Sequence, residues 1–189
     1  MTEEFISLDE LAGIVDLFGT LTHDAVDTAI VEMAFRQGIE VESDTRQEMI
    51  TTAINQYRLI IYPSTEDEMR SIQHPNEQSS DINSNIDETK LNRIAPGPTA
   101  FPTLPAHAED LPRILETDGQ AIDHEAATYA VINRLRDDTE QAITNNNIEL
   151  MRYLRDVTYD IETWAGVATA NDDLISDVRC RLNSALAED

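Results

Sequence analysis

The sequence predicts a mainly α-helical protein that carries one small β-hairpin. Apolar residues recur with helical spacing over residues 8–57 and again from residue 123 to residue 186, as in amphipathic helices with one buried face. The period changes at Leu59–Tyr62, a β-prone run closed by Pro63. A second short run, Leu91–Ile94, can pair with it. We therefore expect an N-terminal three-helix unit with a hairpin, followed by a C-terminal helical set.

Polar residues at the expected helix starts support the first three helices. Ser7 begins a capping box in front of the first helix, and Thr22 can cap the second. Ser43 or Asp44 can cap the third. The inward face of this third helix is expected to consist of Met49, Ile50, Ala53, Ile54 and Tyr57.

Three helices that run into a hairpin have the order of a winged-helix domain. We expect residues 1–63 and 89–95 to form such a winged-helix-like unit, although many small α+β domains share this order. Residues 64–88 between the strands are strongly polar, with isolated Ile72, Ile82 and Ile86. This composition predicts a disordered polar insertion at the hairpin tip.

Residues 96–117 form a proline-rich connector, since five of the seven prolines lie between Pro96 and Pro112. Because proline has a fixed φ and no amide hydrogen, the chain must be extended or turned there. The stretch Pro102–Pro105 matches a PxxP ligand. Phe101, Leu104 and Leu111 could instead anchor the connector on the protein's own core, which is the interpretation that we favour.

The remaining residues, 118–189, predict a helical part that packs on the first unit. Asp123 can cap a helix that continues to about residue 145, and a shorter helix is expected over Ile148–Val157. Tyr159, Ile161 and Trp164 suggest an aromatic corner at the seam between the two halves. A last helix is expected to begin at Asn171.

Charge is the most unusual property of the composition. The chain has 37 acidic and 13 basic residues, a net charge of −24, and one lysine, Lys90. Such a surface is typical of proteins that work in concentrated salt, where self-repulsion is screened. The sequence has no run long enough to cross a bilayer, and its single cysteine, Cys180, excludes an internal disulfide. We expect a cytoplasmic protein with no membrane partner.

No catalytic or metal-binding motif is evident. The four histidines lack the helical spacing that directs two ligands at one ion, and neighbouring acids such as Asp137 and Asp138 point apart on a helix. Nucleophile-elbow, phosphate-loop and dinucleotide motifs are also missing. We therefore expect a protein that is not an enzyme and has no catalytic residue, metal or cofactor.

The third helix stands out because its outer face carries few acids. In a winged helix this element enters the major groove, where Arg, Asn and Gln read base edges. Burial against the C-terminal part would also explain the missing acids, and the long turn at residues 38–43 counts against a standard helix-turn-helix. The candidate partner-binding residues are Arg46, Thr51, Thr52, Asn55, Gln56 and Arg58.

Several stretches resemble an uncharacterised family of small acidic proteins from extremely halophilic archaea. They are Asp9–Gly19, Ala95–Pro105, Glu109–Pro112 and Tyr159–Trp164. The resemblance covers most of the chain except residues 64–88. It implies a haloarchaeal origin and brings no activity, cofactor or catalytic residue.

These observations predict a non-enzymatic binding module of the haloarchaeal cytoplasm. Its partner could be DNA, bound through the third helix. The alternative is a protein-interaction or structural module that docks through the proline-rich segment or the aromatic corner. The sequence leaves the oligomeric state open.

Overall fold

The computed structural model describes residues 5–63, 92–115, 119–165 and 172–187. Within these ranges the protein is mainly helical with one two-stranded antiparallel hairpin, which confirms the predicted class at that level. The predicted insertion at residues 64–88 lies outside the described residues. No described helix combines the length and the apolar character needed to span a bilayer.

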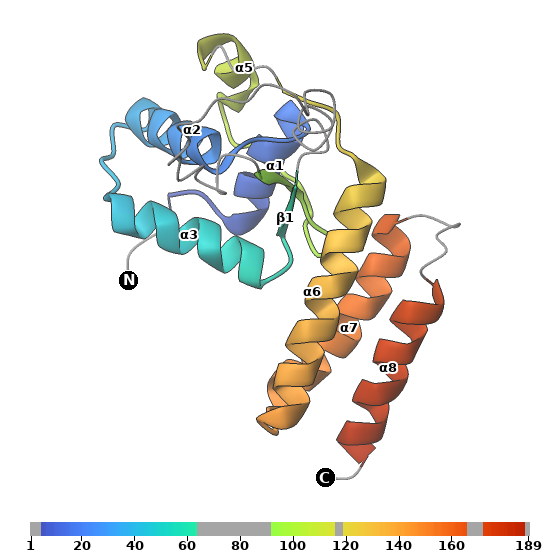
Figure 1. Cartoon of the computed structure of the whole chain (residues 1–189). Helices are drawn as coiled ribbons and strands as arrows, with labels where there is room; N and C mark the ends of the chain where they lie inside the picture. Colours follow the sequence, from blue (N-terminus) through green and yellow to red (C-terminus); the bar gives the residue numbers. More distant parts are fainter. Residues whose placement is uncertain (1–4, 64–91, 116–118, 166–171, 188–189) are drawn as a thin grey trace, which may run out of the picture.

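The elements form an N-terminal part and a C-terminal helical part (Figure 1). The N-terminal part contains α1 (Leu8–Phe18), α2 (His23–Arg36), α3 (Ser43–Asn55), β1 (Leu59–Pro63) and β2 (Asn92–Pro96). Two short helical segments, η2 (Ala108–Asp110) and α5 (Leu111–Ile114), lie within the proline-rich connector. The C-terminal part consists of α6 (His124–Thr144), α7 (Ile148–Ala165) and α8 (Asp172–Ala187), which pack side by side.

Three of the helix starts have the caps that the sequence predicts. The Ser7 hydroxyl accepts the amide of Glu10 at 3.2 Å, and the Glu10 carboxylate accepts the Ser7 amide at 2.7 Å, so the capping box is complete. Thr22 caps α2 and Asp123 caps α6. The cap prediction for α3 was wrong, because its N-cap is Glu42, which makes no side-chain capping bond.

The elements also depart from the predicted boundaries at three places. The third helix ends at Asn55, so Tyr57 is buried from a turn with left-handed backbone (φ 55°) and not from the helix. The shorter helix expected over Ile148–Val157 continues to Ala165, so Trp164 lies on a helix. η2 and α5 were not predicted, because they are too short to show periodicity.

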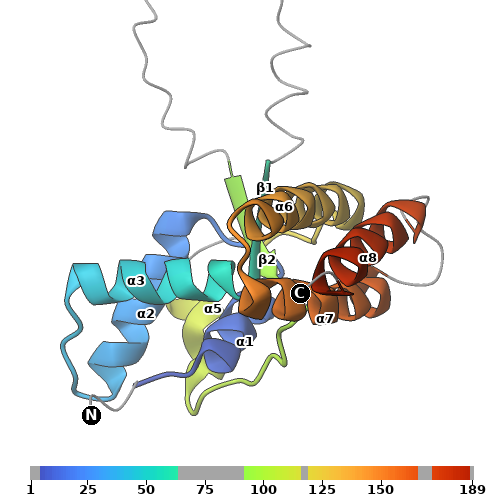
Figure 2. The same ribbon diagram turned by 90° about the horizontal axis from the view of Figure 1, so that it is seen from below.

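The hairpin lies between the two parts of the molecule (Figure 2). Leu59 pairs with Pro96 and Pro63 with Asn92, so the second strand ends two residues later than predicted. Because neighbouring residues of a strand face opposite sides, Leu59 and Ile94 join the core formed by α1, α2 and α3. Ile60, Tyr62 and Ala95 join the core of the C-terminal helices.

Candidate functional site

Of the six candidate residues predicted on the third helix, four lie on α3, whereas Gln56 and Arg58 lie in the turn after it. The six also differ in how accessible they are. Thr51, Asn55 and Gln56 are exposed, whereas Thr52 is partly buried. The inner face of α3 packs into the N-terminal core through Met49, Ile50 and Ala53. The α3 surface is therefore available in part. The accessible candidate residues are the neutral ones, although the acids Asp44 and Glu48 of α3 are exposed as well.

Arg46 is bound within the protein. Its Nε and Nη2 atoms donate to the two carboxylate oxygens of Asp27 at 2.8 and 3.2 Å, and its Nη1 donates to the Val41 carbonyl at 2.6 Å. The hydrogen bond with Asp27 raises the pKa of the Arg46 guanidinium. Such a bidentate pair is among the stronger ionic contacts in proteins. It fixes the start of α3 to α2.

Arg58 is also paired. Its Nη1 atom forms an ion pair with the Asp9 carboxylate at the start of α1. The same Asp9 oxygen accepts the backbone amide of Phe101 at 3.1 Å. Both arginines that the sequence offers for DNA contact thus already hold carboxylates, and their use by a nucleic acid remains a prediction.

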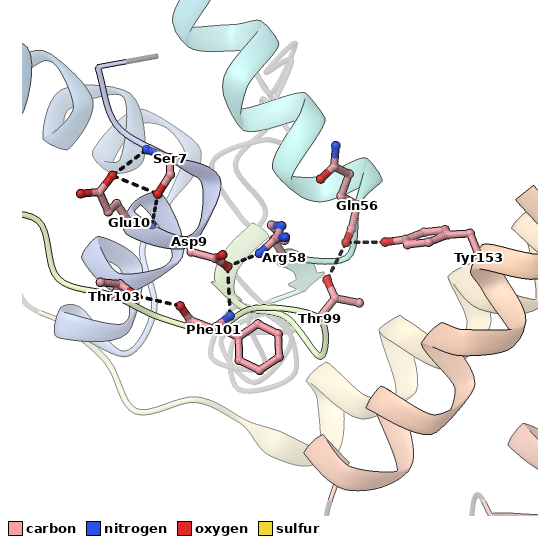
Figure 3. Close-up of polar contacts among 9 residues, drawn as sticks. All are labelled: Ser7, Asp9, Glu10, Gln56, Arg58, Thr99, Phe101, Thr103 and Tyr153. Atoms are coloured by element: carbon pink, nitrogen blue, oxygen red, sulfur yellow. Dashed lines mark hydrogen bonds and ion pairs between the residues drawn. The ribbon is translucent and has the colours of Figure 1, made fainter. Parts of the chain in front are cut away.

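The turn after α3 is the polar junction of the molecule (Figure 3). The Gln56 carbonyl oxygen accepts the Thr99 hydroxyl at 2.6 Å and the Tyr153 hydroxyl of α7 at 2.7 Å. The Arg58 carbonyl accepts the Gly97 amide at 2.7 Å. Burial raises the pKa of the Tyr153 hydroxyl. α3, the connector and α7 are therefore held to one another by backbone carbonyls.

The connector is fixed along α1 (Figure 3). Asp9 binds it twice, since its side chain accepts the Phe101 amide and its carbonyl accepts the Thr103 amide at 3.1 Å. One turn further along α1, a Cβ atom at Gly13 would clash with the Thr103 carbonyl oxygen. Asp9 thus holds the connector against α1, and Gly13 permits its close approach.

The connector nevertheless presents apolar side chains to solvent. Phe101 is 77% exposed and Leu104 is 39% exposed, whereas Leu111 and Pro105 are buried. Of the three predicted anchors, only Leu111 therefore packs fully into the core. We call Phe101–Leu104, together with the exposed Leu17 of α1, the connector edge.

A second polar cluster was not predicted from the sequence. The buried Tyr57 hydroxyl donates to Asp138 of α6 at 2.6 Å, and Arg134 lies 4.3 Å over the Tyr57 ring. Arg134 also donates to the Ile54 carbonyl at the end of α3 and pairs with Asp138 at 3.4 Å. Burial and the bond to Asp138 raise the pKa of Tyr57. No sequence motif joins residues 81 positions apart, so contact prediction would have been needed.

The predicted aromatic corner belongs to α7. Ile161 is fully buried and Trp164 packs beside it in the C-terminal core, whereas Tyr159 is exposed and lies against the Arg179 guanidinium at 3.9 Å. In the described part of the chain, no three His, Cys, Asp or Glu side chains lie close enough together to hold a metal ion.

A model of a family of unknown function, DUF7109, matches residues 9–187. The chain belongs to this family. The match runs from α1 to the end of α8, so the hairpin, the connector and the C-terminal helices all fall within the family's extent. No curated protein and no solved structure matches the chain.

Proposed function

We propose that this DUF7109 member is a non-enzymatic binding module whose partner is a protein that docks on the connector edge. The observation that carries the proposal is the combination of an exposed aromatic side chain with a fixed backbone. Phe101 is 77% exposed, and hydrogen bonds to Asp9 hold the amides of Phe101 and Thr103. An aromatic anchor that is ordered before binding loses little conformational entropy when a partner covers it.

The partner is expected to offer an apolar cleft with a basic rim. Phe101, Leu104 and Leu17 supply the apolar contacts. Asp16, Glu109 and Asp110 are exposed in the same stretches of chain, and the whole chain carries a net charge of −24. Arginine or lysine at the rim of the cleft would complement this charge and steer association.

DNA binding by a winged-helix-like N-terminal part is the second candidate. The exposed side chains of Thr51, Asn55 and Gln56 favour it, since such groups can bond to base edges. Two observations weigh against it. Arg46 and Arg58 are occupied by Asp27 and Asp9, and one face of the hairpin is covered by α6.

We further propose that the module works in the cytoplasm of an extremely halophilic archaeon. The support is the acid excess with a single lysine in 189 residues. At molar salt the Debye length is about 3 Å, so docking there must depend on short-range apolar contacts more than on charge steering. An aromatic anchor meets that requirement.

Site-specific photocrosslinking tests the protein partner. Benzoylphenylalanine placed at position 101 in the full chain is expected to give one defined protein adduct in a high-salt extract. Position 35 is the matched control, because Phe35 is 76% exposed on α2 and is not part of the connector edge. Excess wild-type protein should compete for the adduct, whereas excess Phe101→Ala should not.

The purified partner then allows a quantitative comparison. Phe101→Ala is expected to weaken binding by about 2 kcal/mol, the loss typical of a buried aromatic anchor, and Phe35→Ala should leave it unchanged. Equal adducts from positions 35 and 101 would contradict the proposal. So would selection of a duplex DNA whose binding is lost in Thr51→Ala with Asn55→Ala, an outcome that favours the DNA candidate.

A further inference from the structure

We propose that a cavity of about 300 Å³ between α3, β1 and α6 binds a small neutral molecule with an apolar body and an amide-like polar group. Its volume lies at the lower end of the range for small-molecule sites. The cavity is lined by the end of α3, the middle of β1 and residues 130–138 of α6. The proposal does not depend on the connector edge or on its partner.

The walls of the cavity are largely apolar. Ile60 and Val131 are buried, while Ile61 is 38% exposed at its opening. Ile54 and Ala130 complete this surface. Covering such side chains with an apolar ligand is favourable by about 25 cal/mol per Å² of buried apolar area. An aromatic or aliphatic ring is therefore the expected body of the ligand.

Three polar side chains, Asn55, Arg134 and Asp138, also line the cavity. Asp138 uses Oδ2 for both Tyr57 and Arg134, and Arg134 uses Nη1 and Nε within the protein. Among the described residues, Oδ1 of Asp138, Nη2 of Arg134 and the Asn55 side-chain amide form no hydrogen bond. A ligand can therefore donate to Asp138, accept from Arg134, and do either with the Asn55 amide.

The charges of the cavity select a neutral ligand. The carboxylate of Asp138 and the guanidinium of Arg134 are paired with each other, so neither leaves an unbalanced charge for an ion. An ion would also have to give up its hydration beside apolar walls, which is costly without a counter-charge. An amide or a related heterocycle supplies one donor and one acceptor without that cost.

The polar wall is held in place before a ligand arrives. Tyr57 has left-handed backbone, and its buried ring supports Arg134 while its hydroxyl holds Asp138. A strained, fully packed residue of this kind keeps both charged side chains in one geometry. Preorganisation reduces the entropic cost of binding.

Three probes that differ in one group test the charge and the class of ligand. Benzamide is neutral, benzoate is an anion and benzamidine is a cation. Titrated into the full-length protein, benzamide is expected to shift the methyl NMR signals of Ile54, Ile60 and Ile61 with a dissociation constant of about 1 mM. Benzoate and benzamidine should bind at least about tenfold more weakly. The methyl signals of Ile175 on α8, which does not line the cavity, should not move.

Filling the cavity provides the second arm. Ala130→Phe should abolish the benzamide shifts, whereas Ala187→Phe, at an exposed position of α8, should not. Asn55→Ala removes an exposed amide without disturbing the core and should weaken benzamide binding about threefold or more. The proposal is overturned if benzamide causes no saturable shift, if a charged probe binds as tightly, or if binding survives in both Ala130→Phe and Asn55→Ala.

Discussion

Tyr57 shows how one residue can join the two parts of the protein. Its amide and carbonyl close the turn after α3, its ring is fully buried in the C-terminal core, and its hydroxyl reaches Asp138 of α6. A tyrosine with positive φ is an uncommon and strained conformation. Here Arg134 and the connector hold it from both sides. The strain is therefore offset by contacts that only the complete fold provides.

We expect Tyr57→Phe to lower the free energy of unfolding by about 1 kcal/mol at pH 7, because Asp138 loses the Tyr57 hydroxyl as a donor and keeps only Arg134 among the described residues. Burial raises the pKa of Tyr57 in the folded state above that of the unfolded chain. The contribution of the Tyr57 hydroxyl to the free energy of unfolding is therefore fully present below about pH 10, and it is lost as the pH rises further. Urea unfolding between pH 8 and pH 11 should show a steeper loss of stability for the wild type than for Tyr57→Phe.

The control for this prediction is Tyr129→Phe. Tyr129 lies on α6 but is 64% exposed, so its substitution should change neither the stability at pH 7 nor the alkaline slope. An identical alkaline slope in Tyr57→Phe and the wild type would mean that the Tyr57 hydroxyl does not remain protonated in the fold. Tyr62 and Tyr153, whose pKa values burial also raises, should preserve part of the slope in both variants.

At the scale of elements, the contact between the connector and α1 depends on a helical glycine. Gly13 lies inside α1 and is fully surrounded, and the Thr103 backbone occupies the space where a side chain would be. Glycine weakens a helix interior relative to alanine. Its presence in α1 is explained by the close approach of the connector, which also positions Phe101.

Gly13→Ala therefore gives a test in which two effects have opposite signs. Helix propensity alone predicts a stabilisation of about 1 kcal/mol. The clash with Thr103 predicts instead a net destabilisation of about 1–3 kcal/mol, as in overpacked cores. It should also speed hydrogen exchange at the amides of Phe101 and Thr103. A more stable Gly13→Ala variant with unchanged exchange would show that the connector does not lie against α1.

The elements differ in how far the sequence could predict them. Long amphipathic helices with a side-chain cap, such as α1 and α6, were predicted almost to the residue, because periodicity and capping are local signals. α7 was predicted too short because the residues after Val157 were interpreted as an aromatic corner, although Ile161 and Trp164 continue the buried face of the helix. The hairpin was identified from its change of period, with its second strand displaced by two residues at its C-terminal end.

The candidate site was less predictable for a physical reason. The sequence identified an acid-poor outer face on α3, and Thr51 and Asn55 are indeed exposed there. It could not show that Arg58 would meet Asp9, 49 positions earlier, because ion pairs between distant residues leave no periodic trace. The same holds for Arg134 and the Ile54 carbonyl. Both contacts depend on how the elements pack.

At the scale of the whole molecule, the hairpin couples the two parts. One face of β1 belongs to the N-terminal core through Leu59, and the other belongs to the C-terminal core through Ile60 and Tyr62. Two β-strands alone are marginally stable in water. The hairpin thus requires both cores, and each core is completed by a face of the hairpin.

The net charge acts on the same scale. Within the described residues, six arginines form ion pairs with acids, Arg46 with Asp27 and Arg179 with Glu162 among them. The chain has 37 acidic residues against 13 basic ones, so its acids far outnumber the cations that could neutralise them. Their mutual repulsion destabilises the compact state unless salt screens it.

We therefore expect the melting temperature to rise by at least about 5 °C between 0.1 M and 2 M KCl, since the Debye length falls from about 10 Å to below about 3 Å. Differential scanning calorimetry of the full chain measures this change in melting temperature directly.

Glu48, Asp137 and Glu140 are exposed acids whose side chains form no ion pair among the described residues. The triple variant Glu48→Gln, Asp137→Asn and Glu140→Gln should have a higher melting temperature than the wild type in 0.1 M KCl. The difference between its melting temperatures in 0.1 M and 2 M KCl should therefore be smaller. A melting temperature that is independent of KCl would remove charge repulsion as a determinant of stability, and with it the argument for a salt-adapted host.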